Sequence, residues 1–299
     1  MTLSPIILFV YNRPWHTQQT VEALQKNELT KKSELFIYSE APKNDAIKKS
    51  VDEVRAYIKT INGFKKVTII EREKNWGLAD SIIDGVTNIV NRYGKIIVLE
   101  DDLVTSPYFL KFMNEALEFY KDEKKVWHIS GWNYPIENDG LEDTFLWRAM
   151  NCWGWATWSD RWSYYEKDVQ KIVTQFSKEE IKAFNIDGYY RDFWAQVKDN
   201  RDKRIDTWAI FWYATIFKNS GLCLNPVNTF VRNIGNDGSG ENCISYDIYQ
   251  KELNYKDDIS FIISEGENEL ALAKIKQFYK QNPYKLMDRI KSKLKRVFK

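Results

Sequence analysis

The chain has little of what a metal site built from nitrogen or sulfur ligands requires. It contains 2 His and 3 Cys among 299 residues, and Cys152, Cys223 and Cys243 do not have metal-ligand spacing. We therefore expect no site with several His ligands, and acid–base chemistry must fall mainly on carboxylates. The odd number of scattered cysteines fits a reducing compartment, so a cytoplasmic location is expected.

Long apolar runs and the common phosphate-binding motifs are also missing. No stretch approaches the roughly 18 apolar residues that span a membrane, and the start of the chain lacks the basic segment of a secretory signal. No GxGxxG follows the first apolar run, and a P-loop motif does not occur. If the protein binds a phosphorylated ligand, other groups must hold the phosphates.

The net charge of +2 conceals an acidic body and a basic end. Residues 274–299 contain 10 Lys and Arg against one acid, Asp288, so the rest of the chain is acidic. On a helical wheel, the apolar residues of 284–299 fall on one arc and the basic residues fill the remainder. We expect this amphipathic tail to lie on an anionic membrane surface, with packing on the acidic body as the alternative. No nucleic-acid partner is expected.

Apolar runs and helical stripes alternate through the first hundred residues. Strands are predicted at 6–11, 34–39, 67–70 and 95–99, with helices at 17–26, 47–61 and 78–89 between them. This alternation predicts an α/β fold with a mostly parallel, doubly wound central sheet and helices on both faces. Right-handed crossovers would bring all four strand ends to one edge, where open sheets of this kind bind ligands.

Three carboxylates, Glu100, Asp101 and Asp102, follow the fourth of these strands. Adjacent negative charges disfavour ionisation unless a cation or hydrogen-bond donors compensate. Mg²⁺ and Mn²⁺ prefer oxygen ligands, and Mg²⁺ is commonly held by one or two carboxylates together with substrate phosphates. The triplet therefore favours a divalent-cation site, and the alternative is a solvated acidic turn before the next helix.

The pattern is less regular after the triplet. Helices are expected at 109–120, within 163–196 and at 210–217, and strands at 126–130, 145–148 and 221–226. Two segments are unusual: 151–158 is rich in Trp around Gly154, and 233–242 is rich in glycine. Most of the Trp side chains are expected in the core, although flat aromatic faces also pack against sugar rings. The glycines would permit special backbone angles or close approach of a ligand.

Several short motifs then occur in an order that is specific in combination. They are Tyr11-Asn12-Arg13, Glu100-Asp101-Asp102-Leu103 with Ser106-Pro107 behind it, Ile129–Asn133, Leu146-Trp147-Arg148, Trp153-Gly154-Trp155, Asp206-Thr207-Trp208 and the segment 233–242. From about Pro5 to about Cys243 the chain resembles the GT-A class of nucleotide-sugar glycosyltransferases. Within that class it resembles the inverting N-acetylglucosaminyltransferase I type and bacterial polysaccharide-locus (family 2-like) transferases.

The resemblance implies a division of the chain and a role for each matching residue. It implies a GT-A domain with a nucleotide-sugar-binding half at 1–105, an acceptor-binding half at 106–245 and a C-terminal helical extension at 246–299. It implies Asp102 as the ligand of Mn²⁺ or Mg²⁺ and Asp206 as the catalytic base. The implied donor-binding residues are Asn12, Arg13, Glu40, Asn75, Asp80, Glu100, Asp101, Trp153, Gly154 and Trp155, and the implied acceptor-binding residues are Trp132 and Trp208.

The resemblance also implies a reaction and its partners. A hexosyl or N-acetylhexosaminyl unit would move from a UDP-sugar, with UDP-N-acetylglucosamine as the leading candidate, to a glycan or lipid-linked acceptor. Such acceptors for surface polysaccharides are built at the cytoplasmic leaflet, so peripheral association with the inner face of the cell membrane is expected.

Three positions depart from the pattern of that family. Glu40 stands where relatives carry Asp for the nucleobase, and Asn242 stands where the glycine-rich loop often ends in His. Relatives often have two Asp before the Trp, whereas here only Asp206 stands beside Thr207. The last departure gives Asp206 more weight as the base, and its alternative role is the N-cap of the following helix.

Two other functions compete with a glycosyltransferase. A sugar nucleotidyltransferase would use the same sheet and metal, but it should carry a glycine-rich loop after the first strand, which 11–15 lacks. A non-catalytic carbohydrate-binding protein would use the Trp cluster, but it would leave the acidic triplet without a purpose.

Overall fold

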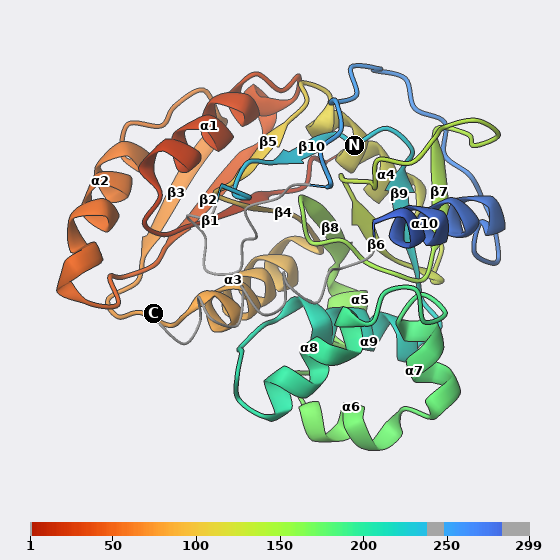
Figure 1. Ribbon diagram of the computed structural model, residues 1–299. Coiled ribbons are helices and arrows are strands. Elements are labelled where there is room, and N and C mark those ends of the chain that lie inside the picture. The colour runs from red at the N-terminus through yellow and green to blue at the C-terminus, as the bar shows by residue number, and fades with distance from the viewer. Residues whose placement is uncertain (1, 238–247, 283–299) are drawn as a thin grey trace.

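A computed structural model describes residues 2–237 and 248–282 of the protein (Figure 1). Its centre is an eight-stranded sheet with the strand order β3-β2-β1-β4-β8-β6-β9-β7. The first half of this sheet consists of β1 (Ile6–Val10), β2 (Glu34–Ser39), β3 (Lys66–Glu71) and β4 (Lys95–Glu100). All three pairings in this half are parallel, so the carboxyl ends of its four strands meet at one edge, as predicted.

Helices cover both faces of the parallel half. α1 (Pro14–Gln25) and α2 (Lys48–Ile58) lie on one side, and α3 (Leu78–Tyr93) lies on the other (Figure 1). β1 and β4 lie at the centre of this half, where both faces of the sheet are covered. Both strands are apolar runs, as is typical of buried strands in parallel sheets. The prediction of an α/β fold with a mostly parallel sheet and helices on both faces is confirmed.

The second half of the sheet is mixed. β8 (Trp155–Trp158) lies antiparallel between β4 and β6 (Val126–Ser130). β6 pairs in parallel with β9 (Leu222–Pro226), and β7 (Thr144–Trp147) forms the edge, antiparallel to β9. The sequence does not predict β8, because Trp155–Trp158 contains no run of Ile, Val or Leu of the kind that identifies β1 and β4.

Shorter elements complete the chain. β5 (Leu103–Thr105) and β10 (Val231–Asn233) form a separate antiparallel pair, which sequence patterns do not predict because each strand has only three residues. The helical region expected within 163–196 is divided into three helices, and Ile186 and Asp187 adopt left-handed backbone angles with φ of 51° and 52° between the second and the third. The remaining helices are the 3₁₀ turns Thr30–Lys32 and Asp45–Ile47, then α4 (Phe109–Phe119), α5 (Ser159–Trp162), α6 (Val169–Gln175), α7 (Lys178–Phe184), α8 (Asp192–Arg201), α9 (Ala209–Lys218) and α10 (Glu269–Gln281).

The C-terminal extension packs on the second half of the sheet through α10. The backbone N–H of Asn268 donates to the carbonyl of Leu146 in β7 over 2.8 Å, and the hydroxyl groups of Tyr279 and Tyr134 are 2.7 Å apart. The amphipathic tail expected at 284–299 lies outside the described residues. Within 2–237 and 248–282, no helix has the length and apolar character needed to cross a membrane.

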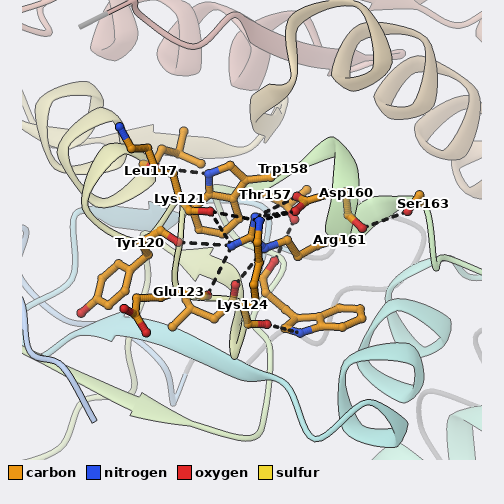
Figure 2. A network of polar contacts seen from close by, with 12 residues as sticks. Leu117, Tyr120, Lys121, Glu123, Lys124, Thr157, Trp158, Asp160, Arg161 and Ser163 are labelled. Atoms are coloured by element: carbon orange, nitrogen blue, oxygen red, sulfur yellow. Dashed lines mark hydrogen bonds and ion pairs between the residues drawn. The ribbon is translucent and has the colours of Figure 1, made fainter. Parts of the chain in front are cut away.

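The buried side chain of Arg161 links elements at the edge of the sheet opposite the carboxyl ends of β1 to β4 (Figure 2). At this edge β6 begins and β8 ends. Arg161 donates to the carbonyl oxygens of Tyr120, Lys121 and Glu123, which follow the end of α4, at 3.2, 2.9 and 3.3 Å. Its guanidinium also lies 4.4 Å from the ring centre of Trp158. Carbonyls at a helix end have no partner within the helix, so this arginine satisfies several of them at once.

Replacing Arg161 with Met should therefore destabilise the fold without touching the carboxyl edge. Met keeps much of the apolar stem but removes the three hydrogen bonds that these carbonyls accept from a charged donor, and a hydrogen bond to a charged group contributes about 1.5–3 kcal/mol. We expect the free energy of unfolding in urea to fall by about 3 kcal/mol. Arg201→Met removes an exposed arginine and should leave the urea midpoint unchanged; equal midpoints for the two variants would contradict a structural role for Arg161.

Candidate active site at the carboxyl edge of the sheet

The acidic triplet lies at the carboxyl end of β4 and continues into the turn before β5. The hydroxyl of Thr20 in α1 fixes this turn, because it donates to the carbonyl of Asp101 over 2.8 Å and accepts from the backbone N–H of Leu103 over 3.1 Å. Asp101 and Asp102 are buried, with 4% and 8% of their surface exposed. Burial, together with the charges of Asp102 and Asp101, raises the pKa of Glu100 to about 8.

Arg13, which precedes α1, reaches both aspartates of the turn. Its Nη2 atom forms ion pairs with Asp101 Oδ1 and, at 2.9 Å, with Asp102 Oδ2. Burial alone would lower the pKa of Arg13, yet the charges of the two aspartates raise it well above its ordinary value. Burial also raises the pKa of Asp101, and Arg13 opposes that effect. Asn12, beside Arg13, is partly exposed at the same edge.

The beginning of the glycine-rich segment covers these carboxylates. The backbone N–H of Ile234 donates to the carbonyl of Asp102 over 2.8 Å. A Cβ atom on Gly235 would lie 2.2 Å from Asp102 Oδ2 and 2.9 Å from Arg13 Nη1. Glycine is therefore required here by close approach. Further along, Asp237 Oδ2 lies 3.0 Å from His16 Nε2, which ties this segment to α1. Asn242 lies outside the described residues.

The ends of β2 and β3 bring a second polar group to the same edge. Glu40 is 7% exposed, and its Oε1 accepts from the backbone N–H of Ala41 over 3.1 Å. Burial raises the pKa of Glu40. Asn75 donates to the carbonyl of Ala41 over 2.7 Å. Arg72 forms an ion pair with Asp84.

The guanidinium of Arg72 also lies 3.9 Å from the ring centre of Trp76, which is 40% exposed. The sequence places the segment 72–75 at this edge but assigns no role to Arg72 or Trp76. Their stacking results from tertiary packing, and no local sequence pattern signals it.

Buried polar atoms without partners gather at this edge. Within the described ranges, Arg13 Nη1, Asp101 Oδ2, Glu40 Oε2 and Arg72 Nε have no hydrogen-bond partner. Such atoms are rare in folded proteins, and each one needs an explanation. Unpaired donors of two arginines and unpaired acceptors of two carboxylates therefore lie at the ends of four neighbouring strands. This edge is suited to a polar, charged ligand.

The carboxylates also fit a divalent cation that is shared with a ligand. Asp101 and Asp102 supply oxygen atoms, one of them unpaired, and the missing side chain of Gly235 leaves room beside Asp102. In the part of the chain that the structure describes, no group of three or more His, Cys, Asp or Glu side chains is arranged to hold a metal. A cation here would therefore need further oxygen ligands from water or phosphate, as Mg²⁺ commonly does.

Asp206 and Asp80, which are far apart in the sequence, meet at one lysine. Lys167 Nζ lies 2.6 Å from Asp206 Oδ1 and 3.2 Å from Asp80 Oδ1. Although burial opposes it, the contact with Asp206 raises the pKa of Lys167. The Asp206 side chain is 65% exposed and lines a pocket of about 370 Å³ together with Asn200, Arg204 and Phe211.

The alternative role of Asp206 as a helix cap is wrong. Helix α9 begins at Ala209, its N-cap residue is Trp208, and no side chain makes a capping hydrogen bond. Lys167 is a residue that sequence analysis missed, because the segment around it is charged and carries no motif.

The Trp side chains expected to contact substrate are packed in the core. Trp132, Trp155 and Trp208 are 3%, 0% and 3% exposed. The rings of Trp155 and Trp208 stack with centroids 5.1 Å apart, and Trp153 meets Trp132 edge-on at 4.8 Å. The structure therefore shows packing for these rings, and it shows no open aromatic face for a sugar at Trp132, Trp155 or Trp208.

Gly154, within the same aromatic segment, is required by packing. It has φ of 64°, and a Cβ atom there would lie 2.8 Å from Val231. Its carbonyl accepts from the N–H of Gly131 over 2.7 Å, so the two glycines allow the end of β6 and the start of β8 to approach closely.

One of the two histidines is a core residue. The indole N–H of Trp212 can only donate, so His128 Nδ1 accepts over 3.2 Å and Nε2 donates to the carbonyl of Asn151 over 3.0 Å. Burial lowers the pKa of His128 to about 3, so the ring stays neutral. His128 therefore takes no part in the site, where the acid–base groups are carboxylates and His16, which contacts Asp237.

Comparisons with known proteins give distant likenesses in structure. No protein-family model matches the chain, and no curated protein matches it in sequence. Solved structures to which the chain is similar include TarS from S. aureus, with TM-score 0.29 and 14% identity over 42% of this chain and 21% of that one. Residues 1–349 of TarS give TM-score 0.40 and 10% identity over 76% and 59% of the two chains. The chain thus spans about a fifth of the first and three-fifths of the second.

A mannosyltransferase, PcManGT from Pyrobaculum calidifontis in complex with GDP-Man and Mn²⁺, gives TM-score 0.40 and 11% identity over 73% of this chain and 69% of that one. Identities and scores at this level do not transfer an activity from these proteins to this chain.

Proposed function

We propose that the protein is a metal-dependent glycosyltransferase that takes a sugar from a nucleotide-diphosphate sugar. The observation that supports this best is the group at the end of β4, where Arg13 joins the buried carboxylates of Asp101 and Asp102 beside unpaired buried polar atoms. An arginine can pair with a diphosphate through two parallel hydrogen bonds. Carboxylates bind the divalent cation that such a leaving group requires.

In this proposal Asp102 holds the cation, and Glu100, Asp101 and Arg13 position the donor around it. A divalent cation bound there supplies charge neutralisation as the bond between sugar and phosphate breaks. Glu40, with one unpaired oxygen, and Asn75 lie where a nucleobase would be recognised at the ends of β2 and β3. UDP is the nucleotide that we favour.

The reaction is proposed to invert the anomeric centre, with Asp206 as the base. Inversion requires a group on the face opposite the leaving group to take the proton of the acceptor hydroxyl. Asp206 is an exposed carboxylate on the wall of a pocket, and Lys167 fixes its position. The acceptor is proposed to be a glycan or a lipid-linked sugar at the inner face of the cell membrane, to which the basic tail would bind. The tail lies outside the described residues.

The proposal predicts metal-dependent stabilisation by one nucleotide diphosphate. Thermal unfolding is to be followed with UDP, GDP, CDP, ADP and dTDP, each with and without Mn²⁺. Because a ligand at 100 times its Kd stabilises a protein by about 2.7 kcal/mol, we expect one of them to raise Tm by about 5 °C with Mn²⁺ and much less without it.

Two results would contradict the proposal. One is the absence of a Tm shift for every nucleotide in the presence of Mn²⁺. The other is release of pyrophosphate from a nucleoside triphosphate and a sugar phosphate, which would identify a sugar nucleotidyltransferase. Hydrolysis of a nucleotide sugar with Mn²⁺ distinguishes an enzyme from a carbohydrate-binding protein.

A further inference from the structure

We propose that Arg13 is a built-in counter-ion that occupies the carboxylates of the metal site until a diphosphate arrives. The cation and the diphosphate would then bind interdependently. This inference rests on the proposed function, because it concerns the same site, but it makes a separate claim about the protein without ligands.

The contacts of Arg13 carry the inference. One nitrogen, Nη2, contacts Asp101 Oδ1 and Asp102 Oδ2, so a single guanidinium group joins both carboxylates. The other terminal nitrogen, Nη1, is buried and has no hydrogen-bond partner within the described ranges. Gly235 closes over the same group, since a Cβ atom there would meet both Asp102 and Arg13. The guanidinium therefore lies between the two carboxylates and the covering segment.

A cation that binds Asp102 must compete with this ion pair. The cation and the guanidinium carry charge of the same sign and would share the same two carboxylates. A cation that displaced Arg13 from Asp102 would leave the guanidinium with Asp101 as its one carboxylate partner and would place a second positive charge beside it, which is unfavourable in a buried site. A cation without a diphosphate is therefore expected to bind weakly.

A diphosphate removes this penalty. It offers oxygen atoms that pair with an arginine in a bidentate manner, including the nitrogen Nη1, which has no partner among residues 2–237 and 248–282. Arg13 can then exchange its carboxylates for phosphate, and Asp102 becomes available to the cation. Linkage requires the effect to be reciprocal: the diphosphate tightens cation binding by the same factor as the cation tightens diphosphate binding.

The test measures Mn²⁺ binding to the complete chain without nucleotide, by electron paramagnetic resonance of the free ion. Arg13→Gln should bind Mn²⁺ at least about tenfold more tightly than the unaltered protein, because the competitor is removed. Arg13→Lys, which keeps the charge but loses the planar fork, should lie between the two and keeps the test valid if the Gln variant does not fold. Arg92→Gln removes an exposed positive charge on α3 and should bind Mn²⁺ as the unaltered protein does.

A second measurement gives the coupling. The Kd of UDP is measured by calorimetry with and without saturating Mn²⁺. The Kd without Mn²⁺ divided by the Kd with Mn²⁺ should be smaller for Arg13→Gln than for the unaltered protein. If Arg13→Gln and Arg13→Lys bind Mn²⁺ no more tightly than the unaltered protein, the inference is wrong while the proposed function stands. If the unaltered protein binds no Mn²⁺ even with each of the five nucleoside diphosphates present, the metal site of the proposed function fails and the inference fails with it.

Discussion

Asp102→Ala should abolish the Mn²⁺-dependent binding of a nucleotide diphosphate and leave the fold intact. The Asp102 carboxylate lies at the end of a strand, in a turn that backbone contacts and Thr20 hold in place. Its partner Arg13 keeps a second carboxylate, Asp101, so the arginine is not left without a counter-ion. The lost interaction is thus one that a bound cation would use, and binding of the nucleotide with Mn²⁺ should fall to the level seen without metal.

The measurement compares Tm with and without Mn²⁺ and nucleotide in the variant and in a matched control. Asp139→Ala removes an exposed aspartate that pairs with Lys274 on the surface, and it should keep the full ligand-induced shift. If Asp102→Ala retains Mn²⁺-dependent transfer at the original rate, Asp102 is not the metal ligand. Retention of the shift by both variants would place the cation elsewhere.

The parallel half of the fold could be predicted from the sequence because its signals are local. β2 has the predicted bounds, and β1 and β4 differ by one residue at an end, since a short apolar run between turn residues identifies a buried strand. Helix α1 begins at Pro14, three residues before the predicted start, because proline is favoured in the first turn. β8 could not be predicted, because its pairing with β4 and β6 is a long-range contact that joins it into a continuous sheet.

The sequence predicts where the site residues lie better than it predicts which residues they pair with. Parallel strand ends share an edge, so Arg13, Glu40 and Asp102 were expected there, and the structure places all three at that edge. The direction in which Arg13 points depends on how α1 packs beside the acidic turn, which no spacing in the sequence reports. For the same reason Lys167 was not predicted as the partner of Asp206.

For the Trp side chains, the sequence does not decide between the core and a sugar-binding surface. Their composition alone suits either a core or a sugar-binding surface, because the same flat apolar face serves both. Only burial distinguishes a core residue from a sugar-binding one. Trp155 and Trp208 are buried and their rings stack on each other, so both are core residues. The glycines follow the same rule: Gly154 needs a left-handed backbone, whereas Gly235 needs space beside Asp102. A glycine-rich sequence does not distinguish these two causes.

Asp206→Asn should lower the rate of sugar transfer by about 10²–10⁴-fold, the usual contribution of a general base, while donor binding stays unchanged. The amide has nearly the same shape as the carboxylate but cannot accept a proton from the acceptor hydroxyl. The side chain is largely exposed and caps no helix, so the substitution should also leave Tm unchanged. These three expectations together distinguish a base from a residue that only supports the fold.

The experiment therefore records transfer per folded molecule, the Kd of the donor and Tm for the same variant. Asp202→Asn serves as the control and should keep full transfer. Asp202 is another acid near the pocket, and it pairs with Arg201 and Arg204 on the surface. If Asp206→Asn lowers Tm sharply and transfer per folded molecule stays the same, Asp206 has a structural role. In that case the base must be another carboxylate, and Asp80, which shares Lys167 with Asp206, is the next residue to test.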